Sequence, residues 1–208
     1  MSNVAPAKIA MAFFDGQNLY RHAKDAFGHH HPNYDPVKLH SAVCAAHGWR
    51  SNLIRFYTGV PDARRDPVWA GYWNNRVLAM KRAGINVTTR KIRYHDEQVT
   101  IDGATTTVSS SREKGIDIRI ALDLVACARR SEFDVAVLFS QDQDLHEVVA
   151  EVRDIARCQN RQIEICCAFP SGENASSKRG IDKTNWFRIE RSLYDACLDS
   201  HDYRPRDS

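Results

Sequence analysis

The sequence of 208 residues lacks several features that would assign it to common classes of protein. It has no run of about 18 apolar residues, which is the length that a membrane-spanning helix needs. It has no internal repeat and no linker that would divide the chain. Lys8 and Asp15 limit the apolar N-terminal stretch to less than the roughly 7–15 residues of a secretory signal core. We therefore expect a cytoplasmic protein with a single domain in residues 1–198 and a charged, flexible tail in residues 199–208.

The cysteines show no C-x-x-C pair, the spacing that is typical of thiol-based metal sites and redox motifs. Most of them lie in apolar stretches, where Cys behaves as a small core residue. The pattern therefore predicts free, reduced thiols, as in the cytosol. The six cysteines are Cys44, Cys127, Cys158, Cys166, Cys167 and Cys197.

Two nucleotide-binding signatures are also absent. No G-x-G-x-x-G follows the first apolar run, and no P-loop occurs anywhere in the chain. A phosphatase of the haloacid dehalogenase type would need a second Asp two residues after Asp15, but Gln17 occupies that position. These absences disfavour both a Rossmann nucleotide-binding protein and that kind of phosphatase.

The excess of positive charge is small. The formal net charge is +3 and the sequence pI is near 8.5, while 43% of the residues are hydrophobic. This composition is typical of a globular domain. The weak basicity permits a nucleic-acid partner without establishing one.

Short apolar runs alternate with segments of helical periodicity along nearly the whole chain, a pattern that is typical of a parallel sheet with helices on its faces. The predicted strands are residues 9–14, 53–57, 85–94, 135–139 and 163–169. The predicted helices are residues 19–26, 36–47, 67–83, 116–128, 145–155 and 185–198. A small hairpin of residues 99–101 and 105–108, turning at Asp102-Gly103, is expected before a flexible loop at residues 109–114.

Acidic residues follow two of the predicted strands. Asp15 follows the first strand, and Asp142 and Asp144 follow the strand at residues 135–139. Asp117 lies at the start of the predicted helix of residues 116–128, and we expect its side chain at the same edge of the sheet. Ligand sites in open parallel sheets lie at the carboxyl ends of the strands. If the two strands are neighbours, these carboxylates converge.

Converging carboxylates would repel one another unless a cation lay between them. Mg²⁺ or Mn²⁺ suits oxygen ligands and could support hydrolysis of a phosphodiester. Each Asp taken alone is equally well explained as a helix N-cap or a turn residue, so the metal hypothesis depends on their coincidence. Asp123 lies six residues beyond Asp117 and faces either another part of such a site or a buried arginine.

Three short motifs occur in order and at the expected element boundaries. They are residues 13–19 (FFDGQNL), residues 114–117 (KGID) and residues 140–144 (SQDQD). Over residues 9–188 the chain resembles the NYN domain of the LabA-like group, a branch of the PIN-like nucleases. One departure is Gln141, which stands where the family usually has Gly and makes the geometry of this turn uncertain.

The resemblance implies a three-layer α/β/α sandwich with a mainly parallel central sheet and a metal-dependent ribonuclease activity. It implies that Asp15, Asp117 and Asp142 hold Mg²⁺ or Mn²⁺, that Asn18 supports them and that Asp144 is a further acidic member. Lys114 and Ser140 would then face the scissile phosphate of an RNA, in single-stranded or loop regions. A non-catalytic RNA-binding module of the same fold is the alternative.

Several other side chains have two interpretations. The basic residues Arg90, Lys91, Arg93 and Arg112 are suited to following an RNA backbone, but they equally suit a solvated strand edge. The stripe at positions 69, 73, 77 and 80, which begins with Trp69, predicts core or the face of a homodimer rather than a base-stacking platform.

Overall fold

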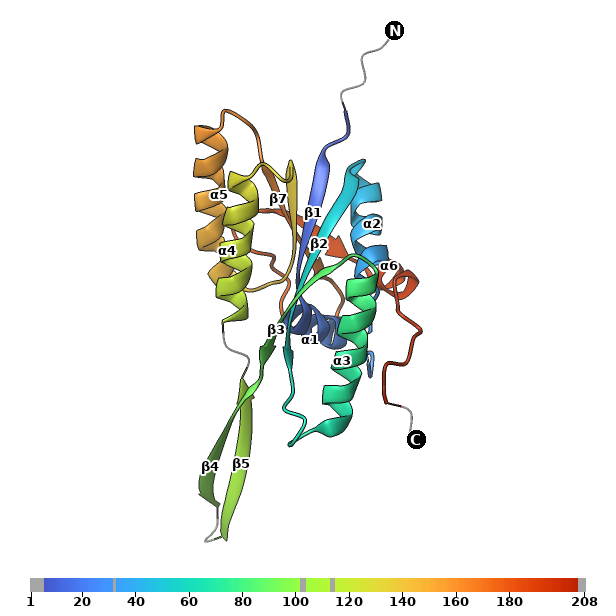
Figure 1. The fold of residues 1–208 in the computed structure, drawn as a ribbon, viewed down its shortest axis with the longest axis vertical. Coiled ribbons are helices and arrows are strands. Elements are labelled where there is room, and N and C mark those ends of the chain that lie inside the picture. Colours follow the sequence, from blue (N-terminus) through green and yellow to red (C-terminus); the bar gives the residue numbers. More distant parts are fainter. Residues whose placement is uncertain (1–5, 32, 102–103, 113–114, 206–208) are drawn as a thin grey trace.

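The computed structural model describes residues 6–31, 33–101, 104–112 and 115–205. Its centre is a six-stranded sheet in which every neighbouring pair is parallel, with the strand order β3-β2-β1-β6-β7-β8 (Figure 1). The strands of this sheet are β1 (Ile9–Asp15), β2 (Arg50–Val60), β3 (Asn86–Lys91), β6 (Val135–Phe139), β7 (Glu164–Pro170) and β8 (Asn185–Ile189).

Helices cover both faces of the sheet. The helices are α1 (Gly16–Phe27), α2 (Pro36–His47), α3 (Pro67–Arg82), α4 (Ile116–Arg129), α5 (His146–Cys158) and α6 (Arg191–Ala196), with a 3-10 turn η1 (Gln143–Leu145). One buried cluster joins the sheet to α1, α2, α3 and α6, and the other joins it to α4 and α5. The fold is therefore the expected three-layer α/β/α sandwich (Figure 1).

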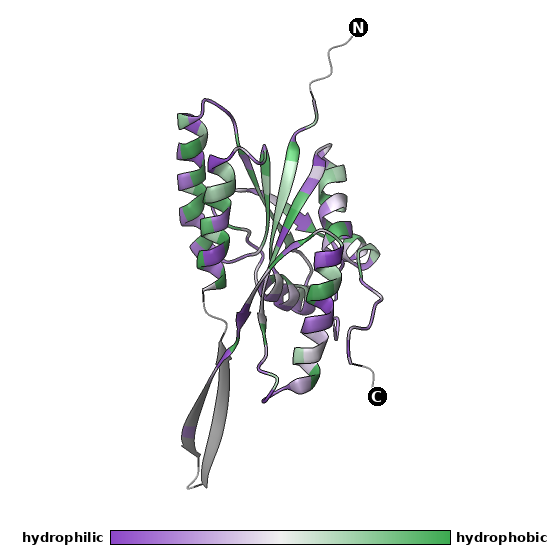
Figure 2. Ribbon diagram, in the orientation of Figure 1, coloured by the Kyte–Doolittle hydropathy of each residue, from purple (hydrophilic) through white to green (hydrophobic). Residues whose placement is uncertain are grey.

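The central strands are buried on both faces, which explains their continuous apolar sequences. In β1 the side chains of Ala12 and Phe14 belong to one buried cluster, while those of Met11 and Phe13 belong to the other. Figure 2 shows hydrophobic and hydrophilic residues alternating around α4 and α5, as expected for helices with only one buried face.

The strand order reverses between β1 and β6. From β1 the chain continues to β2 and β3 on one side, whereas β6 leads to β7 and β8 on the other. Phe14 pairs with Phe139, so both strands end at the same level of the sheet. This is the topological switch point at which open parallel sheets bind their ligands.

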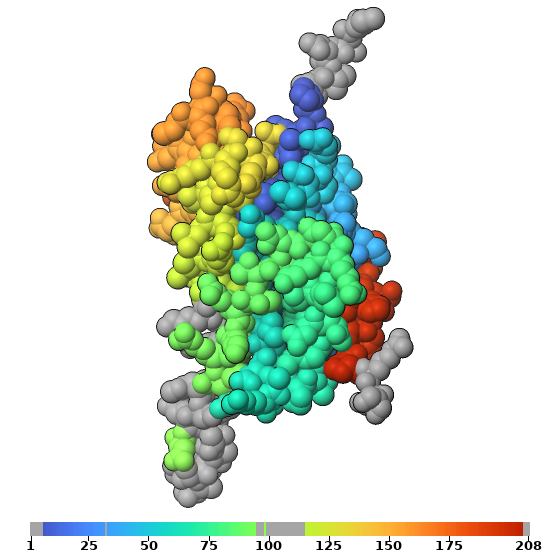
Figure 3. All heavy atoms as spheres, viewed as in Figure 1, coloured from blue at the N-terminus to red at the C-terminus, as the bar shows by residue number. Residues whose placement is uncertain are grey.

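One prediction about the end of the chain was wrong. Residues 185–198 do not form one helix, because β8 pairs in parallel with β7 and only α6 is helical. Trp186, Phe187 and Ile189 suit a strand as well as a helix, so the pairing with β7 decides between them. The described part of the C-terminal segment, residues 199–205, lies beside α3 (Figure 3). The Asn75 side chain donates to the carbonyl of Tyr203 at 3.0 Å.

The hairpin is longer than the sequence suggested. β4 (Arg93–Ile101) and β5 (Ala104–Arg112) form a separate antiparallel sheet that extends from one end of the molecule (Figure 1). Residues 109–112 are therefore strand rather than loop, because they pair with the start of β4. The predicted strand 85–94 is divided between β3 and β4. The proposed turn at Asp102-Gly103 lies outside the described residues.

No helix in the described part of the chain is long and apolar enough to span a membrane. Five of the six cysteines are buried, in agreement with their prediction as small core residues.

Candidate active site

The Asp15 side chain lies at the carboxyl end of β1 and is only 8% exposed. It is the N-cap of α1, because Oδ1 accepts a hydrogen bond from the backbone N–H of Asn18 at 3.1 Å. Oδ2 accepts a longer bond from the Ser140 hydroxyl at 3.4 Å. Asp15 is thus a helix cap, as its position after a strand allowed, and it also contacts the end of the neighbouring strand.

Close packing at this point requires glycine at position 16. A Cβ on Gly16 would lie 2.7 Å from the Phe56 ring and 2.8 Å from the carbonyl oxygen of Tyr57. The start of α1 therefore packs directly on β2, and this holds Asp15 at the edge of the sheet.

The turn after β6 brings further polar groups to the same edge. The backbone N–H of Asp142 donates to the Ser140 hydroxyl at 3.1 Å. Asp142 caps η1, with Oδ1 accepting from the N–H of Asp144 at 3.1 Å. Asp142 is half-buried, whereas Asp144 is exposed. The structure therefore brings Asp15, Ser140 and Asp142 together and leaves Asp144 at the rim.

Asn18 joins the two halves of the site. Its Oδ1 accepts a hydrogen bond from the backbone N–H of Gln141 at 2.9 Å. This bond links the first turn of α1 to the turn after β6. Asn18 therefore supports the relative position of Asp15 and Asp142.

Gln141 has a structural role that the sequence did not reveal. Its side-chain amide donates to the carbonyls of Ser177 and Arg179, at 3.2 and 2.7 Å. Its φ is not in the left-handed region, so the turn accepts Gln where the family usually has Gly. The long Gln141 side chain thus attaches the loop of residues 171–184 to the site. In the sequence, the only indication of this contact is the presence of Gln at a position where the family usually has Gly.

The electrostatics of the pair are unfavourable without a cation. Burial raises the pKa of Asp15 to about 6, and the charge of Asp142 contributes to the rise. Hydrogen bonds from Asn18 and Ser140 and the charge of Arg21 act in the opposite direction but do not compensate. A buried carboxylate with a second carboxylate nearby is the kind of donor set that suits a hard divalent cation.

Asp117 lies in the first turn of α4, half-buried, after Gly115 in the left-handed conformation (φ 80°). α4 contacts both β1 and η1, the elements that carry or follow the two other carboxylates. Among the described residues, however, no three His, Cys, Asp or Glu side chains are close enough to hold a metal ion together.

Asp123 does not belong to this group. It is buried and accepts hydrogen bonds from Tyr57 Oη at 2.8 Å, from Arg55 Nη1 at 3.3 Å and from the Arg119 guanidinium. Of the two roles that its sequence position allowed, the structure shows the arginine partner, although Arg55 and Arg119 are half-buried rather than buried.

The predicted phosphate-binding residues lie further along the same edge. Asp15 pairs with Tyr57, which pairs with Thr88, so exposed Arg90 and Lys91 lie two and three residues beyond the level of Asp15. Arg93, also exposed, begins the hairpin. The side chain of Arg112 and the whole of Lys114 lie outside the described residues.

Comparison with known proteins supports the fold and identifies the family. A protein of unknown function from Vibrio parahaemolyticus has a similar structure, with a TM-score of 0.55 and 19% identity over 89% of this chain and 94% of that one. This similarity supports the fold alone. No curated protein matches the sequence. The family model of the NYN domain matches residues 9–182, which is most of the chain. The protein therefore belongs to the NYN domain family, within the PIN-like nuclease superfamily.

Proposed function

We propose that this protein is a metal-dependent ribonuclease of the LabA-like group that hydrolyses RNA phosphodiester bonds in single-stranded or loop regions. The observation that carries the proposal is the pairing of Asp15 and Asp142 at the switch point of the sheet, with the pKa of Asp15 raised by burial and by its acidic neighbour. Such a pair has an unbalanced negative charge that a divalent cation would neutralise.

The hydrogen bonds leave suitable oxygen atoms for that cation. Oδ1 of Asp15 and Oδ1 of Asp142 serve as helix caps. Among the described residues, the two Oδ2 atoms receive a single hydrogen bond, the 3.4 Å contact from Ser140. In the proposal these oxygens hold Mg²⁺ or Mn²⁺, with Asp117 as the third ligand and Asp144 as an acidic group at the rim.

When bound, Mg²⁺ or Mn²⁺ supplies Lewis acidity toward a phosphodiester. The chain's own residues then bind and orient the RNA. In the proposal Ser140 and Lys114 contact the phosphate, and Arg90, Lys91, Arg93 and Arg112 attract the RNA backbone near it. Asn18 acts as a positioning residue, because it holds the turn after β6 against α1.

One observation favours a second candidate, a non-catalytic RNA-binding module. The described carboxylates do not form a group of three that could hold a metal. A protein that kept the fold and the basic edge, but not a working metal centre, would bind RNA without cutting it.

Cleavage of an end-labelled single-stranded RNA separates the two functions. The native chain is compared in Mn²⁺, Mg²⁺ and EDTA with the variants Asp15→Asn, Asp117→Asn and Asp142→Asn. The matched control is Asp154→Asn, which removes an exposed carboxylate on α5 that pairs with Arg157.

We expect the native chain and the control to cleave the RNA in Mn²⁺ or Mg²⁺ but not in EDTA. We expect the cleavage rate of each site variant to fall by at least about 100-fold, as for the removal of an electrostatic group from an active site. Binding of RNA without metal-dependent cutting would favour the binding module instead. Normal cleavage by Asp117→Asn would remove that residue from the proposed ligands.

A further inference from the structure

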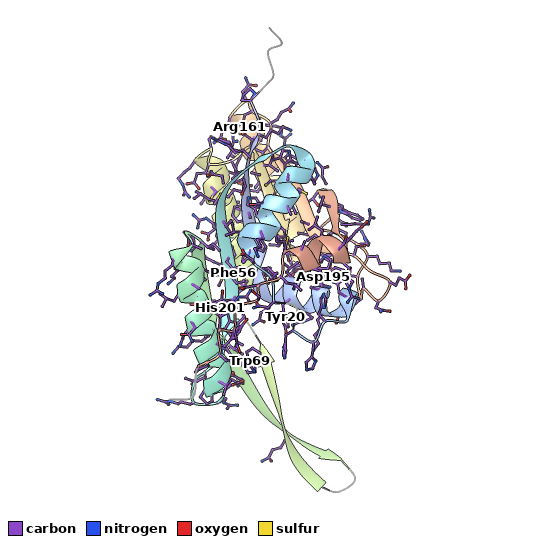
Figure 4. All side chains as sticks on the ribbon, turned by 90° about the vertical axis from the view of Figure 1, so that its right-hand side faces the viewer. Tyr20, Phe56, Trp69, Arg161, Asp195 and His201 are labelled. Atoms are coloured by element: carbon purple, nitrogen blue, oxygen red, sulfur yellow. The ribbon has the colours of Figure 1, made fainter. Side chains whose placement is uncertain are left out.

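A groove beside the candidate active site has no role in the site described above. It has a volume of about 740 Å³ and lies between α1, α3 and residues 199–204. Its lining includes Gly16 and Gln17, which directly follow Asp15. Figure 4 shows Tyr20, Trp69 and His201 near one another, coming from α1, α3 and the C-terminal segment. The volume falls in the roughly 300–1,000 Å³ range of small-ligand sites.

Aromatic side chains form much of this groove. They are Tyr20, Trp69, Tyr72 and Trp73. The indole of Trp69 is 39% exposed although its ring lies 5.1 Å from the ring of Tyr72 in an edge-on arrangement. The His31 ring also lies 6.0 Å from the indole in a tilted arrangement, and the exposed part of Trp69 is available to a ligand. Large exposed aromatics of this kind commonly mark binding sites.

The charges of the groove that have no partner are positive. Arg21 and Lys24 are exposed, and their side chains make no hydrogen bond or ion pair with any described residue. The two acids in the lining are engaged, since Asp202 pairs with Arg204 and Asp199 accepts from the hydroxyl of Tyr203. The groove therefore suits an anionic ligand and disfavours a cationic one.

Buried Arg76 fixes the wall of the groove. Its guanidinium donates to the carbonyl of Tyr34 at 2.8 Å and to the hydroxyl of Tyr72 at 3.4 Å. It also lies 5.3 Å from the ring centre of Trp73. Because Arg76 is engaged in this way, α3 presents its aromatic side chains to the groove from a fixed position.

We propose that this groove binds one unpaired nucleotide of the RNA next to the scissile phosphate, with Trp69 stacking on its base and Arg21 and Lys24 binding its phosphate. The proposal deepens the proposed nuclease function and takes from it the identity of the substrate. A base in a duplex is stacked between its neighbours and is not available to Trp69, so the groove selects single-stranded or loop RNA.

The test measures binding in EDTA, where no cleavage is expected, by fluorescence anisotropy. The probes are a labelled unstructured RNA of about 12 nucleotides, within the span of known single-strand sites, and a blunt-ended RNA duplex of the same length. The variants are Trp69→Leu, which keeps apolar volume but removes the ring, and Trp69→Tyr, which keeps a ring. The control is Leu78→Ala, which removes an exposed apolar side chain of the same helix outside the groove.

We expect Trp69→Leu to weaken binding of the unstructured RNA by roughly 5- to 100-fold, the effect expected for one stacked base. Trp69→Tyr and Leu78→Ala should bind the unstructured RNA with an affinity within about threefold of that of the native chain. Binding of the duplex should not depend on Trp69. All variants should keep the native melting temperature, because residues 69 and 78 are exposed.

The charged residues give an independent test. Arg21→Gln with Lys24→Gln should weaken binding and reduce its salt dependence, with the logarithmic slope falling by about 0.7 for each phosphate that a removed cation had neutralised. The control pair Lys81→Gln with Arg82→Gln removes two exposed cations at the far end of α3. This control should leave the salt dependence unchanged.

Two results would overturn the inference: failure of the native chain to bind the unstructured RNA, or equal binding by the native chain and Trp69→Leu. Loss of binding in Trp69→Tyr as severe as in Trp69→Leu would also contradict stacking. By contrast, Trp69-dependent binding by a native chain that does not cut RNA in Mn²⁺ would refute the proposed nuclease and leave the groove as a binding site for an unpaired nucleotide.

Discussion

At the scale of single residues, the two best-placed acids each have two tasks. Asp15 and Asp142 cap helical turns through one oxygen and leave the other at the switch point. The same Asp can therefore serve both as a helix N-cap and as the metal ligand proposed above. The cap orients the carboxylate and so determines where its second oxygen lies.

The raised pKa of Asp15 predicts a pH-dependent stability in the absence of metal. The folded protein holds the Asp15 proton up to about pH 6, whereas the unfolded chain releases it near the ordinary pKa of 3.8. The contribution of Asp15 to the free energy of unfolding is therefore greatest below pH 4 and falls as the pH rises through 6, by on the order of 3 kcal/mol. Asp15→Asn removes this fall and can still cap α1.

Urea unfolding at several pH values, in EDTA, measures this contribution. Near pH 4 the native chain and Asp15→Asn should be similarly stable, and above pH 6 the variant should be the more stable. A difference between them that does not change with pH would contradict the assignment to Asp15.

Asp123 illustrates a buried charge that stabilises the fold without serving the site. Asp123→Ala would leave the Arg55 guanidinium, whose Nε already has no partner, and the Tyr57 hydroxyl without their shared acceptor. We expect a decrease of about 3–5 kcal/mol in the free energy of unfolding. Asp154→Ala, which breaks an exposed pair, should cost less than about 1 kcal/mol in the same denaturant titration. A similar small decrease for both would show that the buried network is not required.

At the scale of elements, the turn after β6 connects three parts of the chain. It bonds to α1 through Asn18 and to the loop of residues 171–184 through Gln141, while Gln143 adds a bond to the carbonyl of Gly180 at 3.0 Å. Segments far apart in the sequence therefore meet at the end of β6 and keep the candidate site in one arrangement.

Gln141→Ala tests this connection. The change leaves the carbonyls of Ser177 and Arg179 without their donor, so we expect a decrease of about 1–3 kcal/mol in stability. Amide hydrogen exchange should become faster in residues 171–184, while α4 and α5 stay protected. Gln162→Ala, at an exposed position, is the matched control. Unchanged exchange in the loop would mean that other interactions are sufficient to hold it.

At the scale of the whole molecule, binding of a metal at the switch point should stabilise the entire fold. A ligand present at about 100 times its Kd adds about 2.7 kcal/mol, which in a domain of this size raises Tm by roughly 5–10 °C. We expect Mn²⁺ to raise the Tm of the native chain and of Asp154→Asn, but not that of Asp15→Asn. Scanning calorimetry with and without Mn²⁺ measures the effect. An equal rise in all three proteins would place the bound metal elsewhere.

The alternation of strands and helices was predictable because it depends on local apolar periodicity. Five of the six central strands and five of the six helices lie where the sequence places them, with shifts of a few residues at their ends. The acids at the ends of β1 and β6 were predictable for the same reason, since the ends of buried strands are visible in the sequence. The strand order was not, because nothing local specifies which strands become neighbours.

What only the tertiary structure decided depends on contacts between distant residues. β8 is a strand because β7 provides backbone hydrogen-bond partners for it, although the apolar pattern of its residues is compatible with a helix as well as with a strand. Asp123 turns toward Arg55, which is 68 positions away. The groove at Trp69 exists because residues 199–204, expected to be frayed, pack beside α3. Local patterns thus determine the elements and their polar ends, whereas long-range pairing and packing determine which of those ends meet.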